Sequence, residues 1–251
     1  MSIIDSFDES EEIVKAELCV IGQKKLPEIA IVVFKKELMD YIAGNTKFKE
    51  YSSIDVCGEA VKIYVTNIGE SDVMIYRTYT GGPASTAMME ELHARGVKKF
   101  IIFGSCGQLT SNLKKGAFII PTEAYRDEGT SYHYLPASDF VDVESSAELA
   151  KIFEKENILY VLTKTWTTDA LFKETKEKMN KRVASGCEVV EMECASIMAV
   201  AKSRGFKAYQ FLYADDTLDS EVWDMKTLKE DRLYILKECL NIAYKIVEHI
   251  K

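Results

Sequence analysis

The sequence predicts an α/β protein, a single domain with three layers (α/β/α) and a mixed central sheet. Strand-like runs rich in Ile, Val, Phe and Tyr recur along the 251 residues, and helical patterns alternate with them. The chain has four prolines and no low-complexity linker, which favours one large core. We expect an N-terminal extension over residues 1–26 and one domain over residues 27–251.

Seven short segments carry the strand pattern. Several of them are apolar on successive residues, as strands buried on both faces are. They cover residues 29–34, 62–67, 73–79, 100–104, 116–121, 160–166 and 208–214.

Three segments carry a helical pattern. The first begins at Pro83, which suits the first turn of a helix, and ends before Gly96, a residue type that favours a C-terminal cap. The second covers residues 189–204 and ends at Gly205, and the third is an amphipathic helix over residues 233–250. A predicted strand follows each of the first two, so the order helix, glycine, strand occurs twice.

Composition narrows the class of ligand. The net charge is −8 and Lys and Arg form no long block, which argues against nucleic acid as the partner. No apolar run fits a signal peptide or a membrane span, so we expect a cytoplasmic protein that binds a small molecule. The six cysteines show no C-x-x-C pair and do not cluster with the three histidines, so neither a metal site nor a disulfide is expected.

Glycines follow two of the predicted strands, at the edge where ligands bind in sheets of this class. Gly81, Gly82, Gly104 and Gly107 would let backbone N–H groups approach a ligand, and the helix after Pro83 adds a positive dipole end. This arrangement suits an anion or a hydroxyl-rich sugar. We expect a turn over residues 104–107. A purely structural role for these glycines, in turns between strands and helices, is an equally good interpretation.

Acidic residues at two further places also invite a functional interpretation. Glu191 is explained by the dipole of the helix that it enters, whereas Glu193 lies between apolar stretches and needs donors, which vicinal ribose hydroxyls would supply. Asp215 and Asp216 follow a buried strand and suit a general acid that works near neutral pH. Helix capping or a solvated loop is the alternative for the two aspartates.

The order of these segments resembles the nucleoside phosphorylase family, which includes purine nucleoside phosphorylases, uridine phosphorylases and methylthioadenosine/adenosylhomocysteine nucleosidases. The resemblance rests on residues 80–109, 126–136, 189–205 and 213–217. It implies the fold of that family and cleavage of the N-glycosidic bond of a nucleoside. It also implies no cofactor, with inorganic phosphate as a potential co-substrate, and a homo-oligomer, either a dimer or a hexamer.

Three residues match family positions that bind the sugar or the phosphate, and the resemblance implies the same roles for them. Glu193 matches the residue that binds the ribose hydroxyls, and Met192 matches a methionine packed under the sugar. Ser105, between Gly104 and Gly107, matches the Ser/Thr that contacts phosphate and sugar.

The base-binding side of the site is implied in the same way. Asp216 stands where purine-acting members keep the aspartate that protonates N7 as the glycosidic bond breaks. Leu171 and Phe172 stand in the segment that stacks on the base. In residues 126–136, Tyr132 and His133 either border the site or belong to a packed loop.

The chain departs from the family at the phosphate-binding arginines. Three arginines of phosphorolytic members fall at Leu38, Cys57 and Ile102, and Phe34 stands at a family glycine. An apolar side chain cannot replace the charged fork that an arginine offers to phosphate.

Three hypotheses follow from this departure. Lys35, Lys36 or Arg77 could rebuild the phosphate pocket, although exposed surface charges are the simpler interpretation of the two lysines. Water could replace phosphate, with Glu37 as the base that activates it. The chain could also bind a nucleoside without turnover. We expect phosphorolysis of a purine nucleoside to free base and ribose 1-phosphate, with hydrolysis as the alternative.

Overall fold

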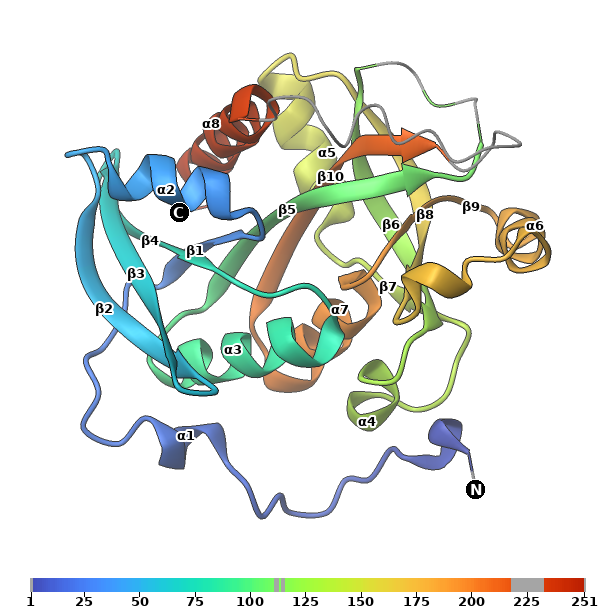
Figure 1. The fold of residues 1–251 in the computed structure, drawn as a ribbon, viewed down its shortest axis with the longest axis horizontal. Coiled ribbons are helices and arrows are strands. Elements are labelled where there is room, and N and C mark those ends of the chain that lie inside the picture. The colour runs from blue at the N-terminus through green and yellow to red at the C-terminus, as the bar shows by residue number, and fades with distance from the viewer. Residues whose placement is uncertain (1, 111–112, 114–115, 218–232, 251) are drawn as a thin grey trace.

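A ten-stranded mixed sheet forms the centre of the molecule (Figure 1). The computed structural model describes residues 2–110, 113, 116–217 and 233–250, and of Asp216 and Thr217 it describes only the backbone. The strands are β1 (Ile29–Val33), β2 (Lys49–Val56), β3 (Glu59–Ile68), β4 (Ser71–Arg77), β5 (Lys99–Gln108), β6 (Phe118–Asp127), β7 (Phe140–Asp142), β8 (Tyr160–Thr168), β9 (Cys187–Glu191) and β10 (Lys207–Thr217).

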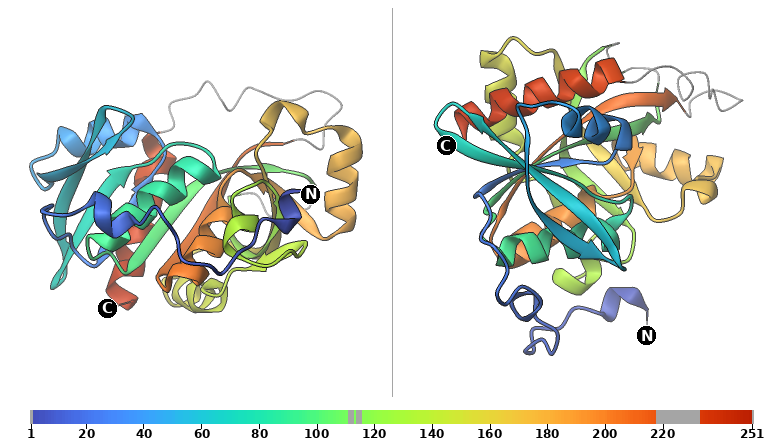
Figure 2. Two further views of the ribbon diagram at one scale, coloured as in Figure 1. Left: turned by 90° about the horizontal axis from the view of Figure 1, so that it is seen from below. Right: turned by 60° about the vertical axis from the view of Figure 1, so that its left-hand side comes forward.

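Helices cover both faces of the sheet, and the resulting three layers confirm the predicted fold class (Figures 1 and 2). Helices α2, α5 and α8 pack on one face, and α3 and α7 pack on the other. The helices are α1 (Ala16–Cys19), α2 (Lys36–Ala43), α3 (Gly82–Ala94), α4 (Ser131–Tyr134), α5 (Ser146–Lys155), α6 (Lys176–Ala184), α7 (Cys194–Arg204) and α8 (Leu233–His249), with short 3-10 turns η1 (Ile3–Asp5) and η2 (Leu171–Lys173).

The strand order closes part of the sheet into a ring. The order is β10-β6-β8-β9-β5-β1-β4-β3-β2, with β7 paired to β6, and β10 also pairs with β5. Strands β5, β9, β8, β6 and β10 therefore form a closed set of neighbours, while β1 to β4 continue as an open sheet. This closure joins segments far apart in the sequence, and no local pattern predicts it.

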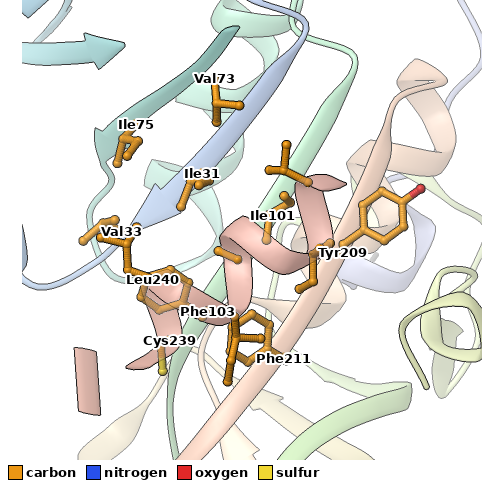
Figure 3. Packing of buried hydrophobic residues seen from close by; sticks show 14 of the residues in the cluster. Ile31, Val33, Val73, Ile75, Ile101, Phe103, Tyr209, Phe211, Cys239 and Leu240 are labelled. Carbon is orange, nitrogen blue, oxygen red and sulfur yellow. The ribbon is translucent and has the colours of Figure 1, made fainter. Parts of the chain in front are cut away.

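The core on the α8 side explains why the parallel strands are apolar on successive residues. Alternate side chains of β1, β4, β5 and β10 pack under α8 (Figure 3). The intervening side chains pack under α3 and α7. The labelled members of the first cluster are Ile31, Val33, Val73, Ile75, Ile101, Phe103, Tyr209, Phe211, Cys239 and Leu240. Removing this apolar surface from water is the main force that holds the layers together.

All seven predicted strands occur, and the predicted helix caps are confirmed. Pro83 lies in the first turn of α3, while Gly96 (φ +111°) and Gly205 (φ +77°) adopt left-handed backbone after α3 and α7. A side chain with a Cβ rarely adopts such a conformation, which explains glycine at both helix ends.

Two local predictions were wrong. Residues 187–191 form strand β9 and not the start of a helix, because Val189 and Val190 are buried between β8 and β5. The segment from Gly104 to Gly107 is not a turn, since β5 continues to Gln108 and pairs with both β10 and β9.

The N-terminal segment runs outside the helical layer that contains α3 (Figure 2). Helix α1 packs against α3, and the N–H group of Leu26 donates to the carbonyl oxygen of Arg95 at 2.9 Å. Among the described helices, none is long and apolar enough to cross a membrane.

Candidate functional site

A cleft of about 300 Å³ opens at the carboxyl ends of β1, β5 and β10. This is the edge at which the sequence predicted a ligand site. Six of the predicted site residues line the cleft, namely Gly104, Ser105, Gly107, Leu171, Met192 and Glu193.

Three predicted residues lie away from the cleft wall. The guanidinium of Arg77 is 4.0 Å from the carboxylate of Glu59 and stacks on the ring of Tyr79. Glu37 is exposed on α2, and the side chain of Phe172 is 90% exposed to solvent. The structure therefore does not bring Arg77, Glu37 or Phe172 into the pocket that their predicted roles require.

The aspartate pair lies near the carboxyl end of β10, which ends at Thr217. Asp215 lines the cleft, and the backbone of Asp216 pairs with Gly107 after an irregularity in the register. The side chain of Asp216 lies outside the described residues. Its role as a general acid stays a prediction.

Glu191 ends β9 and caps helix α7. Its Oε2 accepts the backbone N–H groups of Glu193 at 2.8 Å and of Cys194 at 2.7 Å. These N–H groups lack partners within a helix, and a carboxylate is favoured at this end of the dipole. This contact confirms the interpretation of Glu191 as a residue placed by the helix terminus.

Two threonines of β8 complete the environment of Glu191. The hydroxyl of Thr167 donates to Oε1 of Glu191 at 2.6 Å, and that of Thr165 donates at 3.3 Å. The N–H group of Ala195 donates to Thr167 Oγ1 at 3.0 Å, which leaves the hydroxyl hydrogen of Thr167 directed at Glu191. Burial raises the pKa of Glu191, and these four donors, which favour its charged form, oppose that rise.

Glu193 lies 8% exposed in the cleft wall and has a different environment. The N–H group of Gly81 donates to its Oε1 at 2.6 Å, and Gly81 has left-handed backbone (φ +100°). Burial, with the charge of Glu191 as the second cause, raises the pKa of Glu193 to about 8, and the N–H group of Gly81 opposes this. Burial therefore favours the protonated form of Glu193, whereas two hydroxyl donors from a ligand would favour the charged carboxylate.

Lys35 is the one basic residue among the described residues that line the cleft. It precedes α2, and its ammonium forms no ion pair with any described residue, whereas the neighbouring Lys36 pairs with Asp40 at 2.6 Å. Acidic residues outnumber it in the lining, which also contains Glu174, Glu191, Glu193 and Asp215. The described part of the cleft lining thus offers one cation to neutralise a phosphate group.

The positions that match the family arginines face elsewhere. Leu38 and Ile102 are fully buried in the two cores, and Cys57 is exposed in the turn between β2 and β3. The ring of Phe34 packs against Gly104, where an added Cβ would lie 3.6 Å from the ring. An apolar ring therefore covers part of the wall that Ser105 shares.

Sequence reasoning gave Phe34 no role and undervalued Lys35. The signal was their position directly after a buried strand, which is the place where ligands bind in such sheets. Tyr132 is buried and donates its hydroxyl to the carbonyl of Arg126 at 3.0 Å, while His133 is exposed. Tyr132 is therefore packed, as one of the two interpretations predicted, but both residues lie in helix α4 and not in a loop.

Comparison with known proteins places these features in a family. The family model of the phosphorylase superfamily matches residues 28–250. Guanosine phosphorylase of Halorubrum lacusprofundi is 27% identical over 203 residues, covering 79% of this chain and 82% of the relative. The DeoD-type purine nucleoside phosphorylase of Bacillus cereus is 25% identical, with 74% of each chain covered. Uridine phosphorylase of Escherichia coli is 22% identical, with 70% of this chain and 76% of the relative covered.

A solved structure agrees with the fold. Purine nucleoside phosphorylase from Toxoplasma gondii, in complex with immucillin-H, matches with a TM-score of 0.72 and 19% identity, covering 88% of this chain and 90% of that chain. The predicted resemblance is confirmed by the family match across nearly the whole described domain. The chain belongs to the phosphorylase superfamily.

Proposed function

We propose that this protein cleaves the N-glycosidic bond of a purine nucleoside and transfers the ribose to inorganic phosphate. The observation that carries the proposal is the buried carboxyl group of Glu193 in the wall of the cleft, held by the N–H group of Gly81 and flanked by Met192. Relatives named guanosine phosphorylase and purine nucleoside phosphorylase support this choice.

The chemistry requires stabilisation at two places. As the glycosidic bond breaks, the sugar acquires oxocarbenium character and the base acquires negative charge. Glu193 would accept the two ribose hydroxyls and hold the sugar. Asp216 would donate a proton to N7 of the purine, and a phosphate oxygen would bond to C1′ on the face opposite the departing base.

Phosphate would be held by Lys35 and Ser105, which line the same cleft. We expect Lys35→Ala to raise the KM for phosphate by roughly 10- to 100-fold, because one charged hydrogen bond is worth about 1.5 to 3 kcal/mol. The KM for the nucleoside should change little. Initial rates at varied phosphate and saturating nucleoside measure this effect.

Lys36→Ala is the matched control for Lys35→Ala. Lys36 is exposed, pairs with Asp40 and does not line the cleft, so its loss should leave both KM values unchanged. Equal effects of the two substitutions would contradict the role of Lys35.

Hydrolysis is the second candidate, and a specific observation favours it. The ring of Phe34 packs on Gly104, and Lys35 is the single cation among the described lining residues. A pocket with an apolar ring and one lysine among several acidic residues is a poor phosphate site, which favours water as the nucleophile.

One assay separates the two reactions. The protein is incubated with inosine, guanosine, adenosine, uridine and methylthioadenosine, with and without phosphate, and free base is measured. Release that requires phosphate supports phosphorolysis, and equal release without phosphate establishes hydrolysis. If no base is released but a nucleoside raises the Tm, the chain binds nucleosides without cleaving them.

Asp216→Asn tests the general acid. We expect it to lower kcat for purine nucleosides by roughly 100- to 10,000-fold, because general acid catalysis contributes about that factor. The far-UV circular dichroism spectrum and Tm should stay near those of the unsubstituted protein. Undiminished purine release would exclude Asp216 as the proton donor.

A further inference from the structure

A third buried glutamate, Glu128, lies in the segment that follows β6. The residue is 6% exposed, and its two carboxylate oxygens accept the N–H group of Ser131 at 3.0 Å, the hydroxyl of Ser131 and the hydroxyl of Ser196 at 2.5 Å. The Nε–H group of Arg126 donates to Ser131 Oγ at 2.8 Å, which directs the hydroxyl hydrogen of Ser131 toward Glu128. Burying a carboxylate is costly, and these donors offset that cost.

Ser196 connects this network to the first turn of α3. It is fully buried on α7, and a Cβ added at Gly82 would lie 2.1 Å from Ser196 Oγ and 3.1 Å from Thr130 Oγ1. Gly82 therefore packs directly against Ser196, whose hydroxyl donates to Glu128. The preceding residue, Gly81, is the one whose N–H group donates to Glu193.

Ser196 is connected to Glu193 in two ways, along helix α7 and through Gly82 of α3 and the preceding Gly81. Along α7, Ser196 lies three residues after Glu193, which is the N-cap of that helix. Across the helix pair, Ser196 seats Gly82 and thereby fixes the N–H group of Gly81 at 2.6 Å from Glu193 Oε1. A displacement of Ser196 would change both the backbone and the hydrogen-bond partner of the carboxyl group that lines the cleft.

We propose that Glu128 is a positioning residue for Glu193, acting through the hydroxyl of Ser196 and the close packing of Ser196 on Gly82. The inference rests on the proposed function for its consequence in nucleoside binding. Its physical basis, the geometry of Gly81 and Glu193, does not depend on which ligand the cleft takes. Glu128 itself does not line the cleft.

The experiment compares Glu128→Ala with Glu128→Gln in the full chain. Alanine leaves Ser196 without its acceptor, whereas glutamine retains one carbonyl oxygen that can accept from both Ser196 and the N–H group of Ser131. We expect Glu128→Ala to weaken inosine binding about 10- to 100-fold, since displacements of about 1 Å at a site have effects of this size. Glu128→Gln should restore most of the affinity.

The titration of Glu193 gives a readout that needs no nucleoside. In protein labelled with ¹³C at the glutamate carboxyl groups, the resonance that disappears in Glu193→Gln identifies Glu193. Because the N–H group of Gly81 lowers the pKa of Glu193, Glu128→Ala should raise that pKa above the value of the unsubstituted protein. If Glu128→Ala does not fold, Ser196→Ala breaks the same connection and should shift the pKa in the same direction.

Glu90→Ala is the matched control. Glu90 is a half-buried carboxylate further along α3 that accepts from Tyr134 at 2.7 Å and from Arg204 at 2.5 Å, without contact to Gly82. The substitution should lower the Tm and leave both the titration of Glu193 and inosine affinity unchanged.

The titration and binding measurements separate failure of the positioning role from failure of the proposed function. If folded Glu128→Ala and Ser196→Ala both leave the titration of Glu193 unchanged, the positioning role is overturned. If the unsubstituted protein binds no nucleoside while both variants raise the pKa of Glu193, the proposed function fails and the positioning role stands.

Discussion

Glu193→Gln is expected to reduce kcat/KM for the nucleoside by roughly 100- to 10,000-fold. A carboxylate accepts two ribose hydroxyls through charged hydrogen bonds, each worth about 1.5 to 3 kcal/mol, and a neutral amide cannot accept both. The amide oxygen can still accept the N–H group of Gly81, so the wall of the cleft should keep its shape. Initial-rate measurements with each nucleoside that the protein cleaves give this value.

The same substitution is expected to stabilise the fold at alkaline pH. The pKa of Glu193 is about 8 in the folded chain, against an ordinary value of 4.5. Between these values the folded chain binds one more proton than the unfolded chain, so the free energy of unfolding falls as pH rises and levels off above pH 8. The glutamine variant has no such loss, because an amide does not titrate.

The stability gap between Glu193→Gln and the unsubstituted protein should therefore grow with pH. We expect it to be small near pH 5 and on the order of 2 to 4 kcal/mol at pH 8, because one pKa unit corresponds to about 1.4 kcal/mol. Urea unfolding at the two pH values measures it. Glu188→Gln, on the same strand but outside the cleft, is the control, and the gap should grow more for Glu193→Gln than for this variant. A gap that does not depend on pH would contradict the protonation of Glu193.

Gly82→Ala has the second large expected effect. An added Cβ would lie 2.1 Å from Ser196 Oγ and 2.8 Å from Ser196 Cβ, distances at which α3 and α7 must separate. Overpacking of this kind costs about 1 to 3 kcal/mol or more in the free energy of unfolding. Because Gly81 must shift with Gly82, nucleoside cleavage should fall by at least about tenfold as well, on the order of the loss that follows a displacement of about 1 Å.

A double-mutant cycle tests the cause of the Gly82→Ala effect. Ser196→Gly removes both atoms that the new methyl group meets, so Gly82→Ala should destabilise the chain less in that background than alone. Gly44→Ala is the control, since its nearest neighbour would be the carbonyl oxygen of Asp40 at 3.4 Å and its φ is −81°. If the effects of Gly82→Ala and Ser196→Gly on the free energy of unfolding are additive, the clash with Ser196 does not cause the loss of stability.

The sequence by itself determined the elements whose causes are local. The strands that are apolar on both faces, the left-handed glycines at 96 and 205, and the amphipathic C-terminal helix all depend on side chains within a few residues. The sequence also predicted that Glu193 needs donors, because a carboxylate between two apolar stretches is costly to bury without them, and in the structure the N–H group of Gly81 is one such donor. The family resemblance rested on residues 80–109, 126–136, 189–205 and 213–217, and the family model matches residues 28–250.

The tertiary structure decided what depends on contacts between distant segments. Arg77 could not be excluded from the cleft by sequence, because its partners Glu59 and Tyr79 come from the neighbouring strand and the loop after β4. The entry of Lys35 into the cleft depends on the start of α2, and the extension of β5 past Gly104 depends on pairing with β9 and β10.

The contact that defines the candidate site has the same origin. Gly81 and Glu193 are 112 residues apart, and their hydrogen bond exists because α3 and α7 pack side by side with Gly82 against Ser196. The sequence predicted a ligand-binding role for both Gly81 and Glu193. Only the packing of the two helices decided that they meet, because hydrogen-bond geometry depends on positions that no neighbouring residue fixes.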